Sequence, residues 1–422
     1  MYNRLISVNI VNLTYTFAPE VEMINDKMRK LGSERSEIRE LFEYGIKRKA
    51  EIGEENVFDF SLGNPSVPCP EEVTCAMEKL MKDCEPTNLH GYTSAAGDPS
   101  VRAAIAKHIS SVHGLKVSQN DLYLTVGAAA ALTCALNALV SNNEEVLVIA
   151  PYFPEYKVFI EQTGAKMVSV PSKAETFRPD VDAIASAINE KTAAIILNYP
   201  NNPTGAIISD ECLKDISNCL NEASKKFNKD IYIISDEPYR ELVYDGDAVP
   251  FIPNYYDNTI VCYSYSKSLS IPGERIGYCM VNPAANDHDA IYHAICGAGR
   301  ALGYVCAPAL LQKVIPYCLG MTSDITIYDK NRQLLLTKLS EYGFEMVKPQ
   351  GAFYLFLKSP IDNSKEFSKI AMEHELLLVP SDSFGYPGYV RISYCVKTET
   401  IEKALPAFKA LAERMQILRG NI

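Results

Sequence analysis

Residues 260–281, IVCYSYSKSLSIPGERIGYCMV, decide the fold because two apolar runs in this stretch flank a short polar loop. The runs Ile260–Ser264 and Ile276–Val281 have the length and residue types of β-strands. They are apolar throughout, as expected of strands that are covered on both faces. Five similar runs lie upstream, at Leu122–Val126, Val146–Ala150, Lys166–Val170, Ala193–Asn198 and Ile231–Asp236. Helical patterns lie between many of them, so the sequence predicts an α/β fold with a mostly parallel sheet flanked by helices.

The chain changes character near residue 300, where helices and short strands follow one another without the earlier rhythm. The expected elements there are helices at about 307–319, 325–342 and 363–374, strands at 352–358, 376–379 and 389–394, and a last helix. This mixture predicts a smaller α+β domain. The expected segments are an extension at 1–22, an N-terminal segment at 23–64 packing with the small domain, a large domain at 65–305 and a small C-terminal domain at 306–422.

Composition excludes several classes of function. The 41 basic and 52 acidic residues give a net charge of −11, which argues against nucleic acid as the main partner because phosphate binding needs basic patches. No run approaches the roughly 18 apolar residues of a membrane span. Residues 5–13 are apolar but interrupted by Asn9 and Asn12, unlike a signal peptide. The 12 cysteines form no C-x-x-C pair, and no H-E-x-x-H occurs, so we expect buried reduced thiols, no metal site and a cytoplasmic protein.

Lys267 has an unusual setting for a lysine. It follows a predicted strand, lies among small hydroxyl residues, and precedes a proline and a glycine. A lysine at a strand end can form a Schiff base with a carbonyl compound. Ser264 and Arg275, three residues before and eight after it, are suited to bind a phosphate. The alternative for this segment alone is an ordinary structural loop.

Asp236 ends another buried-type strand, in IYIISDEPY. Ligands of α/β sheets gather beyond such strand ends, and a buried carboxylate there needs a partner. A pyridinium N–H is one suitable partner, and a helix N-cap or an internal ion pair is the alternative. Tyr239 is three residues further on and is expected in the same cavity.

Two further strand ends carry candidate binding segments. The run NYPNNPTG at 198–205 is turn chemistry, and its Asn202 can hydrogen-bond a ring oxygen of a cofactor. In LTVGAAAAL at 124–132 a helix is expected to begin near Ala128. The free N–H groups of such a helix start can bind an anion, although alanine-rich helix starts are common.

Two isolated side chains complete the candidates. Phe153, in PYFPEY, can stack on an aromatic ring or pack in the core. Arg391, in YVRISY, is a charge within an apolar strand, and a buried arginine needs an anion. That anion is either a substrate carboxylate or an internal acid.

Together and in this order, these segments resemble the class I/II pyridoxal-phosphate-dependent aminotransferases of fold type I, the aspartate aminotransferase superfamily. The similarity runs from about Ile38 to Ala412. The NNPTG run, the Asp-x-x-Tyr pair, the Ser-x-x-Lys loop with an arginine eight residues on, and the late arginine carry it jointly. The resemblance implies the large domain with a central sheet and the smaller α+β domain of that fold.

The resemblance also implies a role for each cofactor-binding position. Pyridoxal 5'-phosphate would be held covalently as an aldimine on Lys267, which would also move the proton during catalysis. Asp236 would pair with the pyridine nitrogen, Tyr239 and Asn202 would contact the phenolic oxygen, and Phe153 would stack on the ring. The phosphate end would be bound by Gly127, Ala128, Ala129, Ser264 and Arg275.

Substrate binding and assembly follow from the same resemblance. Arg391 would bind the substrate α-carboxylate, assisted by Asn202 and the backbone at Gly63. Tyr92, in LHGYTSAAG, resembles the tyrosine that reaches the phosphate from the partner subunit, which implies a homodimer with shared active sites. The implied reaction is ping-pong transfer of an amino group between an L-amino acid and a 2-oxo acid.

The chain departs from the family pattern at two places. Ala128 and Ala129 offer no hydroxyl side chains to a phosphate, so their backbone must serve. No second arginine for a distal carboxylate can be placed, and Arg35, Arg39 and Arg300 are candidates only. We expect an aspartate/alanine-type or a broad activity.

Two other classes of function fit parts of the sequence. A carbon–sulfur lyase, an aminocyclopropanecarboxylate-type synthase or a decarboxylase would use the same lysine, aspartate and arginines to break a different bond. A cofactor-binding regulator of transcription would need a DNA-binding module, but residues 1–60 offer one helical pattern, near 37–50, and no helix-turn-helix pair.

Overall fold

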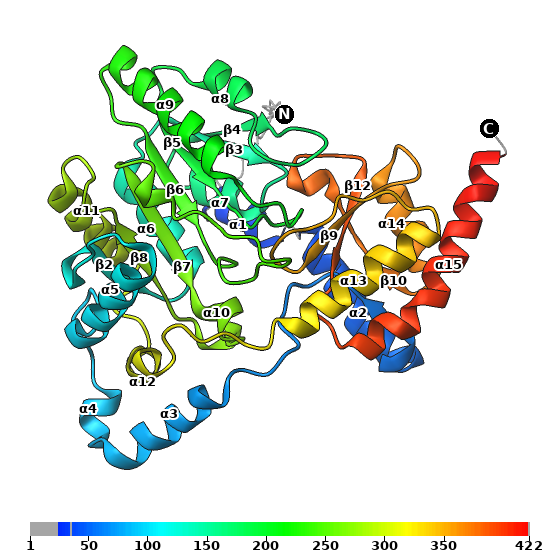
Figure 1. Cartoon of the computed structure of the whole chain (residues 1–422), viewed down its shortest axis with the longest axis horizontal. Helices are drawn as coiled ribbons and strands as arrows, with labels where there is room; N and C mark the ends of the chain where they lie inside the picture. The colour runs from blue at the N-terminus through cyan, green and yellow to red at the C-terminus, as the bar shows by residue number, and fades with distance from the viewer. Residues whose placement is uncertain (1–23, 34–35, 421–422) are drawn as a thin grey trace, which may run out of the picture.

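A seven-stranded sheet forms the centre of the computed structural model, which describes residues 24–33 and 36–420 (Figure 1). In spatial order its strands are β2 (Leu122–Thr125), β8 (Gly277–Val281), β7 (Thr259–Ser264), β6 (Tyr232–Asp236), β5 (Thr192–Leu197), β3 (Glu145–Ala150) and β4 (Lys166–Pro171). β8 is antiparallel to both of its neighbours, and the remaining pairs are parallel. The predicted mostly parallel sheet is confirmed, and each boundary of these seven strands lies within one residue of its predicted position. Beyond this sheet, the strand predicted at 352–358 begins at Tyr354, and the one predicted at 376–379 divides into Leu376–Leu377 and Val379–Pro380.

Helices cover both faces of this sheet because its strands bury side chains on both sides. Val146 and Val148 of β3 pack toward α6 (Ala128–Leu139), α7 (Glu155–Glu161) and α11 (His288–Ala301). The alternate residues Leu147 and Ile149 pack toward α8 (Val181–Ala187) and α9 (Asp210–Phe227) on the opposite face. α5 (Pro99–His113) covers that opposite face over β2, β7 and β8. It begins as predicted, with the Asp98 carboxylate accepting from the Ser100 amide at 2.9 Å.

Short elements complete the part of the chain around the sheet. These are α3 (Glu71–Asp83), α4 (Pro86–His90), α10 (Tyr265–Ser268), α12 (Ala309–Val314) and the 3₁₀ turns η2 (Gln119–Asp121), η3 (Ile252–Asn254), η4 (Pro272–Glu274) and η5 (Ile315–Tyr317). α3, α4 and α12 pack together at the lower edge of the molecule in Figure 1.

A second, smaller layer lies beside the large sheet. It contains an antiparallel sheet of β11 (Val379–Pro380), β12 (Tyr389–Ser393) and β9 (Tyr354–Lys358), with α13 (Thr326–Glu341), α14 (Ser364–Met372), α15 (Thr398–Gly420) and η6 (Ser381–Phe384). The N-terminal elements are α1 (Asp26–Ser33), α2 (Glu37–Ile52), η1 (Glu54–Asn56) and β1 (Phe58–Asp59). β1 pairs in parallel with β10 (Leu376–Leu377), which ties the N-terminal segment to this layer.

The predicted domain boundaries at 22/23, 64/65 and 305/306 stay predictions. The buried side chains Leu311, Val314 and Ile315 pack in one cluster with α3, α5 and β8 of the large layer. Those of Tyr328 and Leu335 pack with β9 and β12 of the small layer. The extension predicted at residues 1–22 lies outside the described residues.

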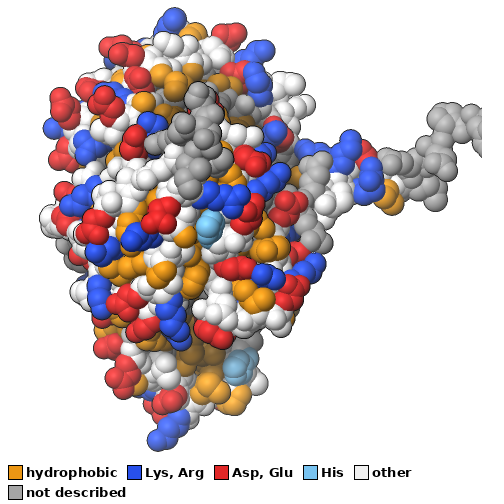
Figure 2. All heavy atoms as spheres, turned by 90° about the vertical axis from the view of Figure 1, so that its right-hand side faces the viewer, with side chains coloured by type: hydrophobic (Ala, Val, Ile, Leu, Met, Phe, Trp, Pro, Cys, Tyr) orange, Lys and Arg blue, Asp and Glu red, His pale blue; other side chains and the backbone are white. Residues whose placement is uncertain are grey.

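The surface charges, the helices and the cysteines show whether the chain has signs of a membrane span, a metal site or disulfide bonds. Figure 2 shows acidic and basic side chains interspersed on the face that lies to the right in Figure 1. Within 24–33 and 36–420, no helix is long and apolar enough to cross a membrane, and no cluster of three metal-binding side chains occurs. All 12 cysteines are unpaired, but the prediction that they are buried holds fully for only five of them; six are partly buried, and Cys75 on α3 is exposed.

Candidate active site

Lys267 lies at the carboxyl end of β7, in the single turn of α10. Ser264 caps this turn, because its hydroxyl accepts from the Ser266 amide at 3.2 Å. The Lys267 Nζ donates to the Gly63 carbonyl at 2.6 Å and lies 5.5 Å from the centre of the Phe353 ring. Burial lowers the pKa of Lys267 from 10.5 to about 8, and the charges of Arg275 and Arg391 act in the same direction. A lysine with this pKa is partly neutral near physiological pH and can act as a nucleophile and a base.

Asp236, the last residue of β6, is buried with one oxygen unpaired. Its Oδ2 accepts from the Tyr156 hydroxyl, and from Asn198 Nδ2 at 3.4 Å, whereas Oδ1 has no hydrogen-bond partner. Burial raises the pKa of Asp236 to about 7; the Tyr156 hydrogen bond opposes this shift and the charge of Glu237 adds to it. A buried carboxylate with a free oxygen is suited to pair with a cationic N–H.

An anion-binding cradle lies on the other side of Lys267. α6 begins at Ala128 with no side-chain cap, so its first backbone N–H groups are available to a ligand. Gly127 precedes it with φ of 90°, and a Cβ at this glycine would lie 2.6 Å from Nη2 of Arg275. Glycine is therefore required for the close approach of the arginine. Arg275 is held by the Pro272 and Val126 carbonyls at 2.8 and 3.2 Å, and the Ser264 and Ser266 hydroxyls lie 2.7 Å apart.

Arg391, on β12, enters the same space from the small layer. Its Nη1 donates to Asn202 Oδ1 at 3.1 Å and its Nη2 donates to the Ser61 carbonyl, but its buried Nε has no partner. The guanidinium lies 4.6 Å from the centre of the Tyr354 ring. Burial lowers the pKa of Arg391 from its usual value. A buried guanidinium without a carboxylate is costly, so this group is suited to an anionic ligand.

These groups converge on one pocket of about 280 Å³. A second lobe of about 100 Å³ shares six of its residues and reaches Asp236. The predicted residues lining the two lobes are Gly63, Ala128, Ala129, Phe153, Asn202, Asp236, Tyr239, Ser264, Lys267, Arg275 and Arg391. The pocket thus combines a lysine, an unpaired buried carboxylate oxygen, an anion cradle and a free arginine N–H, and these residues fit pyridoxal phosphate together with an amino acid.

Several contacts differ from expectation. The Gly63 carbonyl accepts from Lys267, and a Cβ at Gly63 would lie 2.1 Å from the Tyr354 hydroxyl oxygen. Tyr239 hydrogen-bonds the Tyr354 hydroxyl at 2.9 Å. The prediction for Tyr92 concerns the site of a second copy: within its own chain Tyr92 is 92% exposed and does not line the pocket, and its role in a partner's site stays a prediction.

The candidates for a second carboxylate-binding arginine are not in the pocket. Arg39 and Arg300 are exposed and lie outside its lining, and Arg35 falls outside the described residues. Within the described part of the chain, the cations that line the pocket are Lys267, Arg275 and Arg391.

Sequence reasoning missed three side chains of the site. Tyr156 and Asn198 bond Asp236, and Tyr354 packs against both Tyr239 and Arg391. Asn198 begins the NYPNNPTG run and Tyr156 ends PYFPEY, so both lie in segments that the sequence singled out. Their partner, however, is far away in the chain, and nothing local indicates it.

Comparison with known proteins points to one family. The family model for aminotransferase class I and II matches residues 55–408. An aspartate aminotransferase of Pyrococcus abyssi is 31% identical over 90% of this chain and 96% of its own length. Aromatic-amino-acid aminotransferase 2 of Thermococcus litoralis is 29% identical over 91% of this chain and 97% of its own. The crystal structure of an amino transferase from Eubacterium rectale shares 52% identity, covers 93% of this chain and 99% of that chain, and has a TM-score of 0.91.

Proposed function

This chain belongs to the class I and II aminotransferases, and from that premise we propose that its pocket between Lys267 and Arg391 serves L-amino acids with neutral side chains. The chain is a pyridoxal-phosphate-dependent enzyme that moves an amino group between an amino acid and a 2-oxo acid. The observation that carries the proposal is that the three cations lining the pocket within one chain, Lys267, Arg275 and Arg391, all have other roles, while Ile38 and Leu62 are apolar lining residues.

The residues around Lys267 are assigned to the cofactor by what each offers. The free Oδ1 of Asp236 would pair with the pyridine nitrogen, and Tyr239 and Asn202 would bond the ring oxygen. Phe153 would cover one face of the ring. The cradle of Gly127, Ala128, Ala129, Ser264 and Arg275 would hold the phosphate. When bound, the protonated ring supplies an electron sink for charge that develops at the substrate Cα.

The remaining residues position the substrate and move the proton. Arg391 would bind the α-carboxylate through its free Nε while Asn202 fixes the guanidinium. A carboxylate fixed in this way selects which bond at Cα faces the electron sink. The Lys267 Nζ, with its pKa near 8, would then take the proton from Cα of the amino acid. When the second substrate, a 2-oxo acid, is converted to an amino acid, the same group would give a proton back to Cα.

The preference for neutral side chains follows from the pocket lining. Ile38 and Leu62 are apolar residues that line the same pocket as Arg391. Each of the three lining cations, Lys267, Arg275 and Arg391, already has a role, so within one chain no described lining cation is left for a distal carboxylate. Relatives of similar identity are named for aspartate and for aromatic amino acids, so sequence identity alone does not choose between these substrates.

The test is a half-reaction with single amino acids. The purified enzyme with bound cofactor is mixed in turn with alanine, leucine, phenylalanine and aspartate, and the visible absorbance of the cofactor and the 2-oxo acid are measured. We expect the neutral amino acids to change the absorbance and to yield an equal amount of 2-oxo acid. If aspartate reacts best, the proposed side-chain preference is wrong. If ammonia, a thiol or carbon dioxide appears instead, the site belongs to a lyase or a decarboxylase.

We further infer that two copies of the chain form a homodimer with shared active sites. We also infer that the protein is cytoplasmic. Tyr92 is exposed and outside its own pocket, which supports a role in the site of a second copy. Sedimentation at micromolar concentration tests the assembly, and a monomer that retains full turnover would contradict it. The unpaired cysteines are consistent with a reducing compartment.

A further inference from the structure

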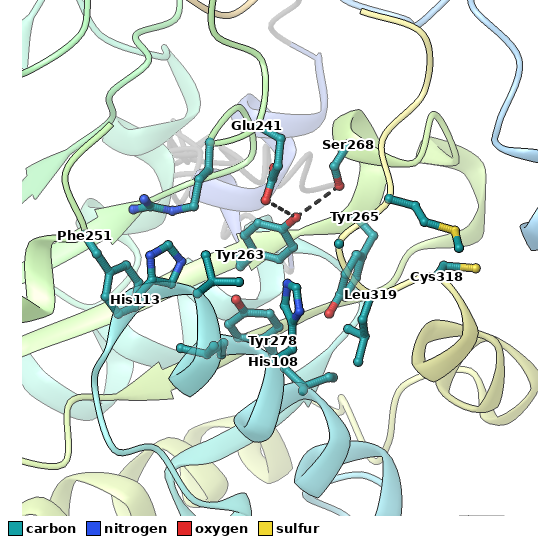
Figure 3. Close-up of a pocket in the computed structure, with 16 residues that line it drawn as sticks. His108, His113, Glu241, Phe251, Tyr263, Tyr265, Ser268, Tyr278, Cys318 and Leu319 are labelled. Atoms are coloured by element: carbon teal, nitrogen blue, oxygen red, sulfur yellow. Dashed lines mark hydrogen bonds between the residues drawn. The ribbon is translucent and has the colours of Figure 1, made fainter. Parts of the chain in front are cut away.

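A second pocket is lined in part by residues 263–268, the segment that also carries Lys267. It has a volume of about 260 Å³ and is bounded by α5, β7, β8 and the segment at 318–321 (Figure 3). Neighbouring residues of one segment face the two sites: Ser264, Ser266 and Lys267 line the active-site pocket, whereas Tyr263, Tyr265 and Ser268 line this one. The two pockets share no lining residue, so this is a separate site.

Glu241 gives this pocket an acid with an unused acceptor. Its Oε1 accepts from the Tyr263 hydroxyl at 2.8 Å, and the same hydroxyl lies 3.1 Å from Ser268 Oγ (Figure 3). Its Oε2 is shielded from solvent and has no hydrogen-bond partner. Burial raises the pKa of Glu241, although the Tyr263 hydrogen bond and the charge of Arg240 oppose the shift. Leaving a buried acceptor unpaired is costly, and a donor in the pocket would recover that cost.

The surrounding groups do not neutralise Glu241 fully. Arg240 lies next to it, but its Nε is bonded to Glu237 and its Nη1 to the Val249 carbonyl. Burial lowers the pKa of His113 to about 4, and the same cause lowers the pKa of His108, so both imidazoles are neutral near pH 7. Among the residues lining the pocket, an ionised Glu241 therefore lacks a dedicated cationic partner.

Aromatic rings line the pocket beside this acid, and Arg240 lies 5.0 Å from the centre of the Phe251 ring. The Tyr263 and Tyr278 rings stack with centres 4.9 Å apart, and Tyr265 meets Tyr263 edge-on at 5.0 Å. The His113 ring stacks on Phe251 at 4.0 Å. The negative face of an aromatic ring attracts a cation, and such contacts strengthen when water is excluded. Apolar side chains such as Ile105, Ile109 and Leu319 supply the rest of the lining.

The same pattern occurs at Asp236 in the active-site pocket. Both acids accept from one tyrosine hydroxyl, keep their other oxygen unpaired, and have a raised pKa. We propose that the Glu241 pocket binds the primary ammonium group of a small amine that has an apolar body and no carboxylate. The ammonium would donate to Oε2 of Glu241 while the apolar body contacts Ile109 and Leu319. The cavity volume of about 260 Å³ leaves room for a small amine.

The test uses 3-methylbutylamine as the probe and calorimetric titration of the enzyme with its cofactor bound. We expect saturable binding that Glu241→Gln weakens by about tenfold or more, because the charge-assisted hydrogen bond is lost. The matched control Glu222→Gln changes an exposed acid on α9 and should bind the amine as the unmodified enzyme does. The acid 4-methylpentanoate, which has the same apolar body with a carboxylate in place of the ammonium group, should not bind at this site.

A second variant separates binding from folding. Met321→Trp fills the pocket from its wall without changing Glu241, and it should abolish amine binding while the visible absorbance of the cofactor stays normal. Equal affinity for the amine in Glu241→Gln, in Met321→Trp and in the unmodified enzyme would overturn the proposal. So would amine binding that changes the cofactor absorbance in proportion, because the amine would then occupy the active site.

Discussion

Asp236 and Glu241 lie five residues apart and face two different pockets with the same local arrangement. Each carboxylate accepts from one tyrosine, Tyr156 or Tyr263, and each keeps one oxygen unpaired. The difference lies in what the rest of the fold brings to them. The Asp236 pocket gathers Lys267 and an anion cradle, whereas the Glu241 pocket gathers neutral imidazoles, aromatic rings and an arginine, Arg240, that is paired with Glu237. The comparison shows that a buried carboxylate with one unpaired oxygen is suited to bind a cationic group. The side chains around that carboxylate determine whether the pocket can catalyse a reaction or only bind the cation.

Lys267→Ala should have the largest effect on turnover. It removes the reactive lysine from the Asp236 pocket, and the Glu241 pocket has no lysine in its lining. A positioned base contributes about 10²- to 10⁴-fold to rate, and this lysine also binds the cofactor covalently, so we expect a loss of at least about 10³-fold in turnover. Steady-state rates measure it, and thermal unfolding checks the fold. Lys214→Ala, at an exposed lysine on α9, should keep full turnover. Turnover retained in Lys267→Ala would show that this lysine is not what makes the Asp236 pocket catalytic.

Asp236→Ala should have the next largest effect on activity. It tests whether the unpaired Oδ1 of Asp236 binds the cationic N–H of the cofactor ring. Hydrogen bonds to charged groups contribute about 1.5–3 kcal/mol, so cofactor affinity should fall by about 10- to 100-fold and Cα deprotonation should slow as well. Equilibrium dialysis of the cofactor and single-turnover rates measure the two effects. Asp215→Ala on α9, also an exposed position, serves as the control. A cofactor affinity equal to that of the unmodified enzyme would show that Asp236 is not the ring's partner.

The pH dependence of stability sharpens the comparison in the cofactor-free protein. The folded pKa of Asp236 is about 7, above its usual 3.8, so the folded state holds the proton more tightly than the unfolded state. Its contribution to stability is therefore complete below about pH 4 and is lost as the pH rises to about 7, by up to about 4 kcal/mol. Asp236→Asn should remove this loss, which urea unfolding across that pH range measures. Parallel curves for the two proteins would contradict the raised pKa.

Tyr156→Phe should have the smallest effect of the four. It removes the hydrogen bond that opposes the raised pKa of Asp236, so this pKa should rise further and the carboxylate should pair less well with a cation. We expect a loss of cofactor affinity of about tenfold or less. Tyr256→Phe, which removes a buried tyrosine hydroxyl bonded to the Ile231 carbonyl away from both pockets, is the matched control. Identical affinities in the two variants would show that the tyrosine does not tune the acid.

The sequence by itself determined the layers of the fold and predicted most residues that line the candidate site. Continuous apolar runs are a local signal, because a strand covered on both faces has no polar side, and these runs gave strand boundaries within one residue. Lys267, Asp236 and Arg391 were predicted because each is a charged side chain at an otherwise apolar strand or strand end, where charge is costly.

Tertiary structure alone decided the partners of these residues. Tyr156 lies 80 residues from Asp236, and Tyr354 lies 115 residues from Tyr239, so no local pattern connects them. Nor could the sequence tell that neighbouring residues in YSYSKS face two different pockets, because α5 and the segment at 318–321 form the second one from distant parts of the chain. Local residue patterns specify where strands and charges lie, but which groups meet depends on packing between segments that only the folded chain brings together.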